Sequence, residues 1–221
     1  AVPGRARVFE NLGIDYCCGG KKSLGEVCRA KNLDPATVIA KLAALDGTAE
    51  SPAANPDAMG LGALCDHIER AHHDWLREEL PRLDFMTRKV AAVHGDHEPR
   101  LHEIRHVFEL FQSEIAVHTA EEERLVFPAI RQLESGSGNR AAGVAALRSV
   151  FAKLESEHGQ AGAALEQLSA LTDRYMPPEW ACNTFRAMFD TLGRLQSNMH
   201  QHVHKENNVL FPRALALGSS S

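Results

Sequence analysis

Four stretches of the chain repeat hydrophobic residues every three or four positions, with histidine or glutamate inside the repeat. Residues at this spacing share one face of an α-helix, the face that normally packs into a core. The repeat positions are His73, Leu76, Leu80 and Leu83; Ile104, Phe108, Phe111, Ile115, His118, Glu122 and Leu125; Leu147, Phe151, Leu154, His158, Ala161, Leu165 and Leu168; and Phe185, Met188, Leu192, Leu195, Met199, His202, Glu206 and Val209. The pattern therefore predicts ionisable side chains inside a helical bundle.

The four stretches predict four long helices, over about 61–91, 99–134, 140–172, and from Pro177-Pro178 to about 216. A polar break at 94–97 and a Ser-Gly-Ser-Gly segment at 135–138 separate the first three. Long helices with short connections are typical of an up-down-up-down bundle. We therefore expect an all-α fold with this bundle at residues 61–217.

The first 45 residues have a different pattern and are interpreted as a small helical domain. Short helices are expected over 7–12 and 35–45, the second because Asp34 suits an N-cap and Pro35 the first helical position. Residues 46–60 are rich in Pro, Ala, Gly and Ser and are interpreted as a linker.

Composition excludes several classes of function. The net charge is −5 without a sustained basic stripe, which argues against nucleic-acid binding. No apolar stretch approaches the roughly 18 residues of a membrane span. Five cysteines are a poor disulfide framework for 221 residues, so a reduced, cytoplasmic setting is expected. Cys28, Cys65 and Cys182 are expected to pack between helices.

The polar residues of the repeat occur as two copies of one motif. His118-x-x-x-Glu122 precedes Phe127-Pro128, and His202-x-x-x-Glu206 precedes Phe211-Pro212, 84 residues later. A single in-repeat histidine stands 45 residues before the first copy (His73) and 44 before the second (His158). Two facing copies predict a pseudo-symmetric site.

Burying six such side chains requires compensation. An unpartnered buried polar group costs about 2–7 kcal/mol, whereas a whole domain is stable by roughly 5–15 kcal/mol. Imidazole and carboxylate groups are ligands of metal cations. The sequence therefore predicts a metal site formed by His73, His118, Glu122, His158, His202 and Glu206.

The donor set narrows the metal. It holds no thiolate, which argues against structural zinc, and six ligands are too many for one tetrahedral ion. Two glutamates can bridge two ions that each bind two histidines. Iron or manganese fits, and the many histidines favour two iron ions. Positions left open on each iron would serve oxygen, nitric oxide or peroxide, or iron transfer.

Neighbouring residues are weaker candidates. His72 competes with His73, but the repeat and the spacing favour His73. Glu121 and Glu123 are expected to be solvated helix charges, and Glu157 could face the site entrance from the second layer. Surface positions are expected for His67, His94, His97, His102, His106, His200 and His204, of which His200 and His204 flank the repeat.

Several runs of residues carry a family resemblance. They are Asp15-Tyr16-Cys17-Cys18-Gly19-Gly20, Asp66-His67-Ile68, His73, Leu80-Pro81, Glu155-Ser156-Glu157-His158, and Glu206-Asn207-Asn208-Val209-Leu210-Phe211-Pro212-Arg213-Ala214. The bundle resembles hemerythrin-like (HHE) domains. The whole chain is similar to the iron–sulfur cluster repair di-iron proteins, the RIC (repair of iron centres) family.

The resemblance implies that these six residues hold an oxo- or hydroxo-bridged di-iron centre. It implies repair of iron–sulfur proteins damaged by nitric oxide or oxidative stress, by iron donation, and a homodimer. Alternatives are a nitric oxide reductase, which would make the protein an enzyme, and a sensor that binds O2 or NO. Cys17 and Cys18 are either a redox, NO or iron relay or two small buried residues in a glycine turn.

Overall fold

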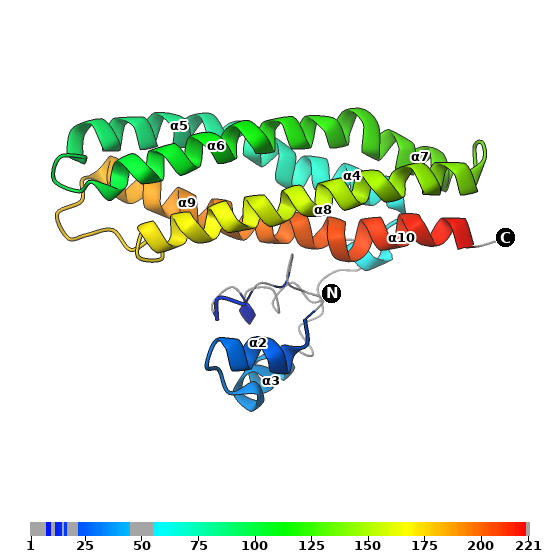
Figure 1. Ribbon diagram of the computed structural model, residues 1–221, viewed down its shortest axis with the longest axis horizontal. Helices are drawn as coiled ribbons and strands as arrows, with labels where there is room; N and C mark the ends of the chain where they lie inside the picture. Colours follow the sequence, from blue (N-terminus) through cyan, green and yellow to red (C-terminus); the bar gives the residue numbers. More distant parts are fainter. Residues whose placement is uncertain (1–7, 10–11, 15, 17–21, 45–54, 220–221) are drawn as a thin grey trace.

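The computed structural model describes residues 8–9, 12–14, 16, 22–44 and 55–219. Four long helical rods lie side by side, with a small helical module beside them (Figure 1). The rods are α4 (Leu61–Ile68), η3 (Glu69–His73) and α5 (Asp74–His94); α6 (Arg100–Glu121), η4 (Glu122–Val126) and α7 (Phe127–Glu134); α8 (Arg140–Leu171); and α9 (Asn183–Lys205), η5 (Glu206–Leu210) and α10 (Phe211–Ala216). A short 3-10 turn, η6 (Leu217–Ser219), follows the last rod.

The rods form the predicted four-helix bundle. Helix α5 packs against α6 and α9, and α8 packs against the same two helices, so each rod has two neighbours. Successive rods run in opposite directions (Figure 1). The prediction of an all-α, up-down-up-down bundle is confirmed. No helix in the described part of the chain is both long and apolar enough to cross a membrane.

The fourth rod begins later than predicted, at Asn183 rather than at Pro177-Pro178. Three consecutive residues before it, Asp173, Arg174 and Tyr175, have positive φ angles, which turn the chain out of α8. The backbone then stays non-helical until Cys182, whose extended conformation marks the N-cap of α9. The two prolines therefore belong to a loop and not to the first helical turn.

Three of the rods contain a π-helical turn at the same level of the bundle: η3, η4 and η5. The amide of Phe127 bonds to the carbonyl of Glu122, and that of Phe211 to the carbonyl of Glu206, five residues back. Pro128 and Pro212 follow directly, and proline cannot supply the ordinary i−4 bond. Turns of this kind are frequent at functional sites.

The wider turn corrects one core prediction. Leu125 was expected to point inward, but 54% of it is exposed. The π-helical turn η4 adds a residue to the helical period, so Val126 and Phe127 take the buried positions instead. A strict 3.6-residue repeat cannot anticipate such a shift.

The hydrophobic core is divided into two clusters along the bundle. One cluster includes Leu83, Phe108 and Leu192, and the other includes Leu64, Ile130 and Phe211. The six side chains predicted as metal ligands form the layer between them. The interior of the bundle is therefore apolar at both ends and polar in the middle.

The small module consists of α2 (Leu24–Ala30) and α3 (Pro35–Ala43), packed around Cys28 and Val38. Helix α3 confirms the expected helix, whereas α2 was missed, although Ser23 and Glu26 form a capping box. Of the expected helix over 7–12, the structure describes residues 8, 9 and 12: Val8 and Phe9 are helical, and the amide of Leu12 donates to the carbonyls of Val8 and Phe9. Most of the expected linker lies outside the described residues.

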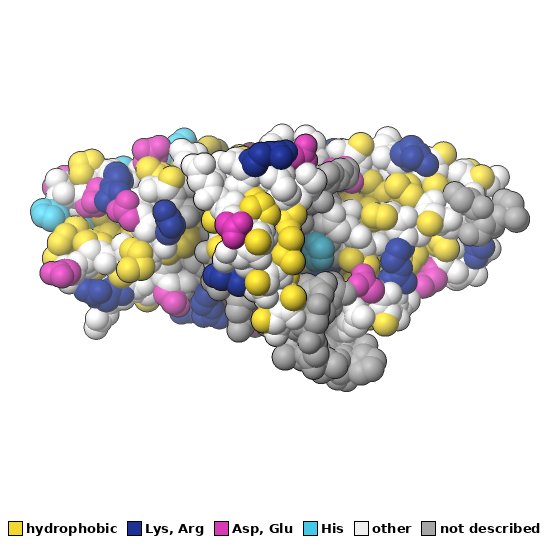
Figure 2. All heavy atoms as spheres, turned by 90° about the horizontal axis from the view of Figure 1, so that it is seen from below, with side chains coloured by type: hydrophobic (Ala, Val, Ile, Leu, Met, Phe, Trp, Pro, Cys, Tyr) yellow, Lys and Arg dark blue, Asp and Glu magenta, His cyan; other side chains and the backbone are white. Residues whose placement is uncertain are grey.

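The end of the expected linker is ordered. Residues Pro56–Ala58 form a 3-10 turn, η2. The guanidinium of Arg213 donates to the carbonyls of Met59 (2.6 Å) and Pro56 (3.3 Å), which attaches this segment to α10. Figure 2 shows the small module lying over the middle of the bundle. The interpretation of residues 46–60 as a linker stays a prediction.

Phe108→Ala should lower the free energy of unfolding by about 3–5 kcal/mol, because Phe108 is fully buried in the core. The control Phe85→Ala, on the neighbouring helix, removes a ring that is 61% exposed and should change stability by less than about 1 kcal/mol. Urea unfolding in the presence of a chelator measures both. Equal losses would contradict this packing.

Candidate metal centre

Six side chains from four rods meet in the polar layer, and all of them are buried. The geometry divides them into two overlapping groups, each with two histidines and the same two glutamates. One group is His73, His202, Glu122 and Glu206, and the other is His118, His158, Glu122 and Glu206. These are the six residues that the sequence predicts as ligands.

The histidine nitrogens face each other in pairs. Nε2 of His73 lies 3.1 Å from Nε2 of His202, and Nε2 of His118 lies 2.9 Å from Nε2 of His158. Two nitrogens bound at right angles to one cation, each about 2.1 Å away, would be about 3.0 Å apart. Each pair is therefore spaced to bind one ion.

Each glutamate directs one oxygen to each histidine pair. Oε2 of Glu122 lies 3.4 Å from Nε2 of His73, and its Oε1 lies 3.3 Å from Nε2 of His118. Glu206 repeats this arrangement from the opposite rod. Its Oε1 is 3.0 Å from Nε2 of His202, and its Oε2 is 3.2 Å from Nε2 of His158. Each carboxylate can therefore offer one oxygen to a cation at either histidine pair.

Iron fits this site for two reasons: several buried donor atoms have no other partner among the described residues, and the donors are imidazoles and carboxylates. Both oxygens of Glu122 and Oε2 of Glu206 are buried and have no hydrogen-bond partner among the described residues. A buried carboxylate in this state is costly unless a cation neutralises it. Mixed imidazole and carboxylate sites inside helical bundles are a setting for di-iron centres.

Hydrogen bonds to Nδ1 orient three of the four histidines. The acceptors are Glu123 for His73 (2.8 Å), Glu157 for His118 (2.8 Å) and Asn207 for His158 (2.9 Å). Because a carboxylate only accepts, Nδ1 of His73 and of His118 carries the proton and Nε2 is left for a metal.

Two of these acceptors bear on earlier expectations. Glu123 was expected to be a solvated helix charge, and that was wrong, because it reaches His73 and also accepts from Arg77 at 2.7 Å. Glu157 is in contact with His118, as a second-layer residue would be. Glu123 and Asn207 each follow a predicted bridging glutamate by one position, a repeat that could have identified them from sequence.

Phenylalanine rings cover the two single histidines. Phe127 stacks on His73 with ring centroids 5.7 Å apart, and Phe211 stacks on His158 at 6.2 Å. The two Phe-Pro pairs of the sequence repeat therefore have equivalent places, since each packs a ring against the histidine of the preceding rod. This packing closes the site on its apolar side.

His72 takes a different place from His73. Its Nδ1 lies 3.1 Å from Oδ1 of Asn198, and its Nε2 lies 2.6 Å from Nζ of Lys205. The amide oxygen only accepts, so His72 Nδ1 donates and Nε2 accepts from the lysine. Burial, with the charges of His202 and Lys205, lowers the pKa of His72 to about 2, which keeps it neutral.

Burial and the carboxylates act in opposite directions on the pKa values of the metal-free site. Burial lowers the pKa of His118, but the contacts with Glu122 and the charges of Glu206 outweigh it and raise the pKa to about 9. The pKa values of His73 and His158 are raised for the same reason. Burial and the neighbouring His73 lower the pKa of His202 well below its usual value.

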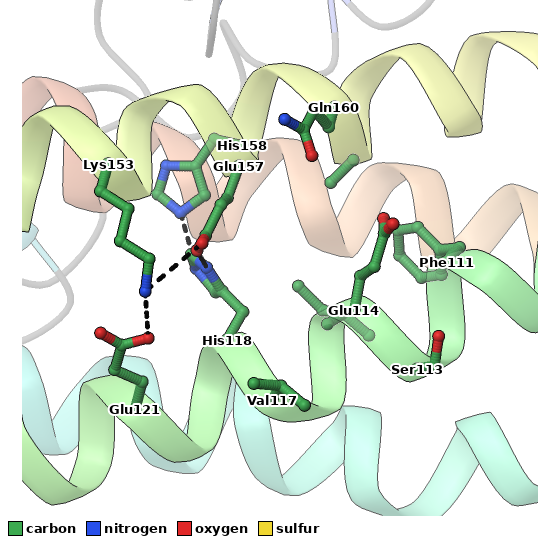
Figure 3. Close-up of a pocket in the computed structure, with 12 residues that line it drawn as sticks. Phe111, Ser113, Glu114, Val117, His118, Glu121, Lys153, Glu157, His158 and Gln160 are labelled. Atoms are coloured by element: carbon green, nitrogen blue, oxygen red, sulfur yellow. Dashed lines mark hydrogen bonds and ion pairs between the residues drawn. The ribbon is translucent and has the colours of Figure 1, made fainter.

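A pocket between α6 and α8 leads to His118 and His158 (Figure 3). Its volume is about 420 Å³. The ammonium of Lys153 stands in it, 2.5 Å from a carboxylate oxygen of Glu121 and 3.5 Å from one of Glu157. Glu157 therefore lines this pocket and contacts His118 from it.

The remaining histidines are only partly at the surface. His97, His102 and His106 are exposed, as expected, but His67, His94, His200 and His204 are half-buried. The ring of Tyr16 lies against His200 (6.0 Å between centroids) and His204 (5.4 Å), which places this residue of the N-terminal segment on α9.

The three described cysteines have two different settings. Cys28 and Cys65 are buried in helix packing, as expected. Cys182 is exposed at the start of α9, so a packing role for it was wrong, because the fourth rod begins after it and not before. Cys17 and Cys18 lie outside the described residues, and their relay role stays a prediction.

Comparison with protein families matches both parts of the chain. Residues 66–214 match the Hemerythrin HHE cation binding domain, and residues 1–46 match the ScdA_N domain, described as a domain of unknown function (DUF542). The first match covers more than half of the chain and includes all six predicted ligands. A metal-binding site is therefore a property of the family to which the bundle belongs.

Two similar proteins align with this chain over nearly their whole length. The chain is 38% identical to the iron–sulfur cluster repair protein YtfE of Musicola paradisiaca (strain Ech703), over 97% of this chain and 92% of the relative. It is 36% identical to the protein of the same name from Enterobacter sp. (strain 638), over 98% and 93%. The chain therefore belongs to the family of these iron–sulfur cluster repair proteins, built on a hemerythrin HHE domain.

Proposed function

We propose that this protein holds two iron ions in the bundle and repairs iron–sulfur clusters damaged by nitric oxide or oxidative stress. The observation that carries the proposal is the pair of glutamates, each with one oxygen at either histidine pair. The printed name of the relatives supports cluster repair as the use of such a site.

The proposed ligands are His73 and His202 for one ion and His118 and His158 for the other, with Glu122 and Glu206 bridging. Two bound iron ions would supply Lewis-acidic, redox-active centres with positions for a small ligand, or iron for transfer to a damaged cluster. The chain contributes buried donors at fixed spacing and an outer layer that keeps the histidine Nε2 atoms free for metal.

Access to the site supports exchange with solvent. The pocket between α6 and α8 ends at His118 and His158 and carries the charges of Glu121, Lys153 and Glu157. We propose that a cation or a small ligand approaches the site through this pocket. We propose Glu157 as the second-layer residue at this entrance.

The relatives' name favours cluster repair over the two alternatives, nitric oxide reduction and O2 or NO sensing. Partners would then be damaged iron–sulfur proteins, and the setting would be the reducing cytoplasm, with which the free cysteines Cys28, Cys65 and Cys182 are consistent. A homodimer stays a prediction.

Glu122→Gln combined with Glu206→Gln should reduce bound iron at least about tenfold, because both bridging charges are lost while side-chain shape is kept. Elemental analysis of protein purified with excess iron measures this. The control Glu103→Gln changes an exposed glutamate of α6 and should leave the iron content unchanged. Full iron content in the double variant would contradict the ligand assignment.

Iron-loaded protein should restore activity to an iron–sulfur enzyme that was first inactivated with nitric oxide. The double glutamine variant should restore none, and Glu103→Gln should match the natural protein. Activity of the client enzyme is recorded before damage, after damage and after incubation. Equal recovery with the double variant would refute repair by the metal centre.

Metal binding should release about one proton or more per chain at pH 7, since the raised pKa values of His118, His73 and His158 keep protons on the metal-free site. Affinity should therefore fall as the pH falls. A pH indicator in weak buffer records the release when Zn²⁺, a redox-inert probe, is added. Zinc uptake without proton release would show that the histidines are not the ligands.

A further inference from the structure

The residues that contact the proposed ligands, called the outer layer below, do not follow the two-fold repeat of the ligands themselves. Exchanging the two helix pairs maps His73 onto His158 and His118 onto His202. The chain neighbours of the ligands are mapped in the same way. Glu123 corresponds to Asn207, Glu157 to His72, and Glu121 to Lys205. Residues in equivalent places can therefore be compared directly.

One pair of equivalents performs the same task. Glu123 accepts from Nδ1 of His73 at 2.8 Å, and Asn207 accepts from Nδ1 of His158 at 2.9 Å. Both histidines are thereby oriented toward the centre. The repeat holds at this position, although one acceptor is charged and the other neutral.

The second pair of equivalents differs. Glu157 accepts from Nδ1 of His118 at 2.8 Å. His72 stands in the corresponding place but lies parallel to the His202 ring, with centroids 5.3 Å apart and planes 8° apart. Nδ1 of His202 is buried and has no hydrogen-bond partner among the described residues. A stacked ring thus replaces the hydrogen bond.

The hydrogen bonds of His72 explain why it does not reach His202. Its two nitrogens are taken by Asn198 and Lys205, at 3.1 and 2.6 Å. The Asn198 amide in turn points to the carbonyl of Ala71, at 3.5 Å. Both ring nitrogens of His72 are therefore used by these hydrogen bonds, and only the face of its ring contacts His202.

The third pair of equivalents carries opposite charges. Glu121 is an anion beside the His118/His158 position, where Lys153 pairs with it and with Glu157. Its counterpart Lys205 is a cation that reaches His72, one ring away from His202. A like charge close to a partly buried cation site lowers the affinity of that site.

Charges beside His73 do not reverse this difference. Glu123 supports His73 but is shared with Arg77, at 2.7 Å, which in turn pairs with Asp74 at 2.5 Å. The His118 side has the corresponding sharing of Glu157 with Lys153. Two differences between the positions remain. The charge of Lys205 has no counterpart of the same sign, and Nδ1 of His202 has no hydrogen-bond partner among the described residues.

We propose that His72 and Lys205 are positioning residues for the His73/His202 position. His72 holds His202 by stacking, and the charge of Lys205 weakens cation binding there. The His118/His158 position then fills first, and the His73/His202 position fills last and empties first. This inference rests on the proposed two-metal function and assigns unequal roles to its two ions.

Titration of the metal-free protein with Co²⁺ at pH 7, followed by its visible absorption and by chelator competition, tests the inference. The natural protein should bind Co²⁺ in two steps. Lys205→Met should tighten the second step roughly tenfold and leave the first unchanged. The matched control Lys89→Met removes an exposed lysine of α5 that lies over Phe85 and should change neither step. The proposal would be overturned if the ratio of the two Co²⁺ affinities in Lys205→Met were the same as in the natural protein.

Single ligand variants identify which position fills first. His73→Ala should keep the tight step, whereas its equivalent His158→Ala should keep only the weak one. Loss of the tight step in His73→Ala would also overturn the inference. Circular dichroism checks that each variant is folded. A natural protein that binds no Co²⁺ and no iron contradicts the proposed function itself.

Discussion

The structure depends on how two buried glutamates, Glu122 and Glu206, share their oxygens between two pairs of histidines. Each carboxylate is fully buried between the four rods. Left alone, such groups would oppose folding, because a buried anion without a partner is expensive. Cations at the two histidine pairs would satisfy every one of these donors. The atoms that destabilise the metal-free protein are therefore the atoms that form the site.

This layer also organises the fold around it. It separates the core into two apolar clusters, and three of the rods widen into π-helical turns at its level. The Phe-Pro pairs link the two effects. Pro128 and Pro212 cannot continue the ordinary ladder, and the preceding rings of Phe127 and Phe211 stack on His73 and His158.

The two halves of the bundle repeat the ligands but not their surroundings. On one side of the centre, Glu121 and Glu157 line a pocket and pair with Lys153. On the other side, His72 and Lys205 stand in the equivalent places. If the site holds two ions as proposed, this difference would make the two positions bind them with unequal strength. The residues around the ligands, and not the ligands themselves, thus make the two halves of the site different.

The sequence alone determined the fold class, the ends of most helices and the six residues that meet in the centre. It did so because helical periodicity is local, and because histidine and glutamate in apolar positions are informative wherever they occur. The doubled motif of His118 with Glu122 and His202 with Glu206 added the symmetry of the site.

Only the tertiary structure decided the rest. The wider turn that exposes Leu125 and the late start of α9 depend on non-local packing and on a run of positive φ angles. The partners of Glu123, His72 and Lys205 depend on which side chains other rods bring within hydrogen-bond distance. A periodic pattern specifies the face on which a residue lies, but its partner is fixed only when the helices have packed.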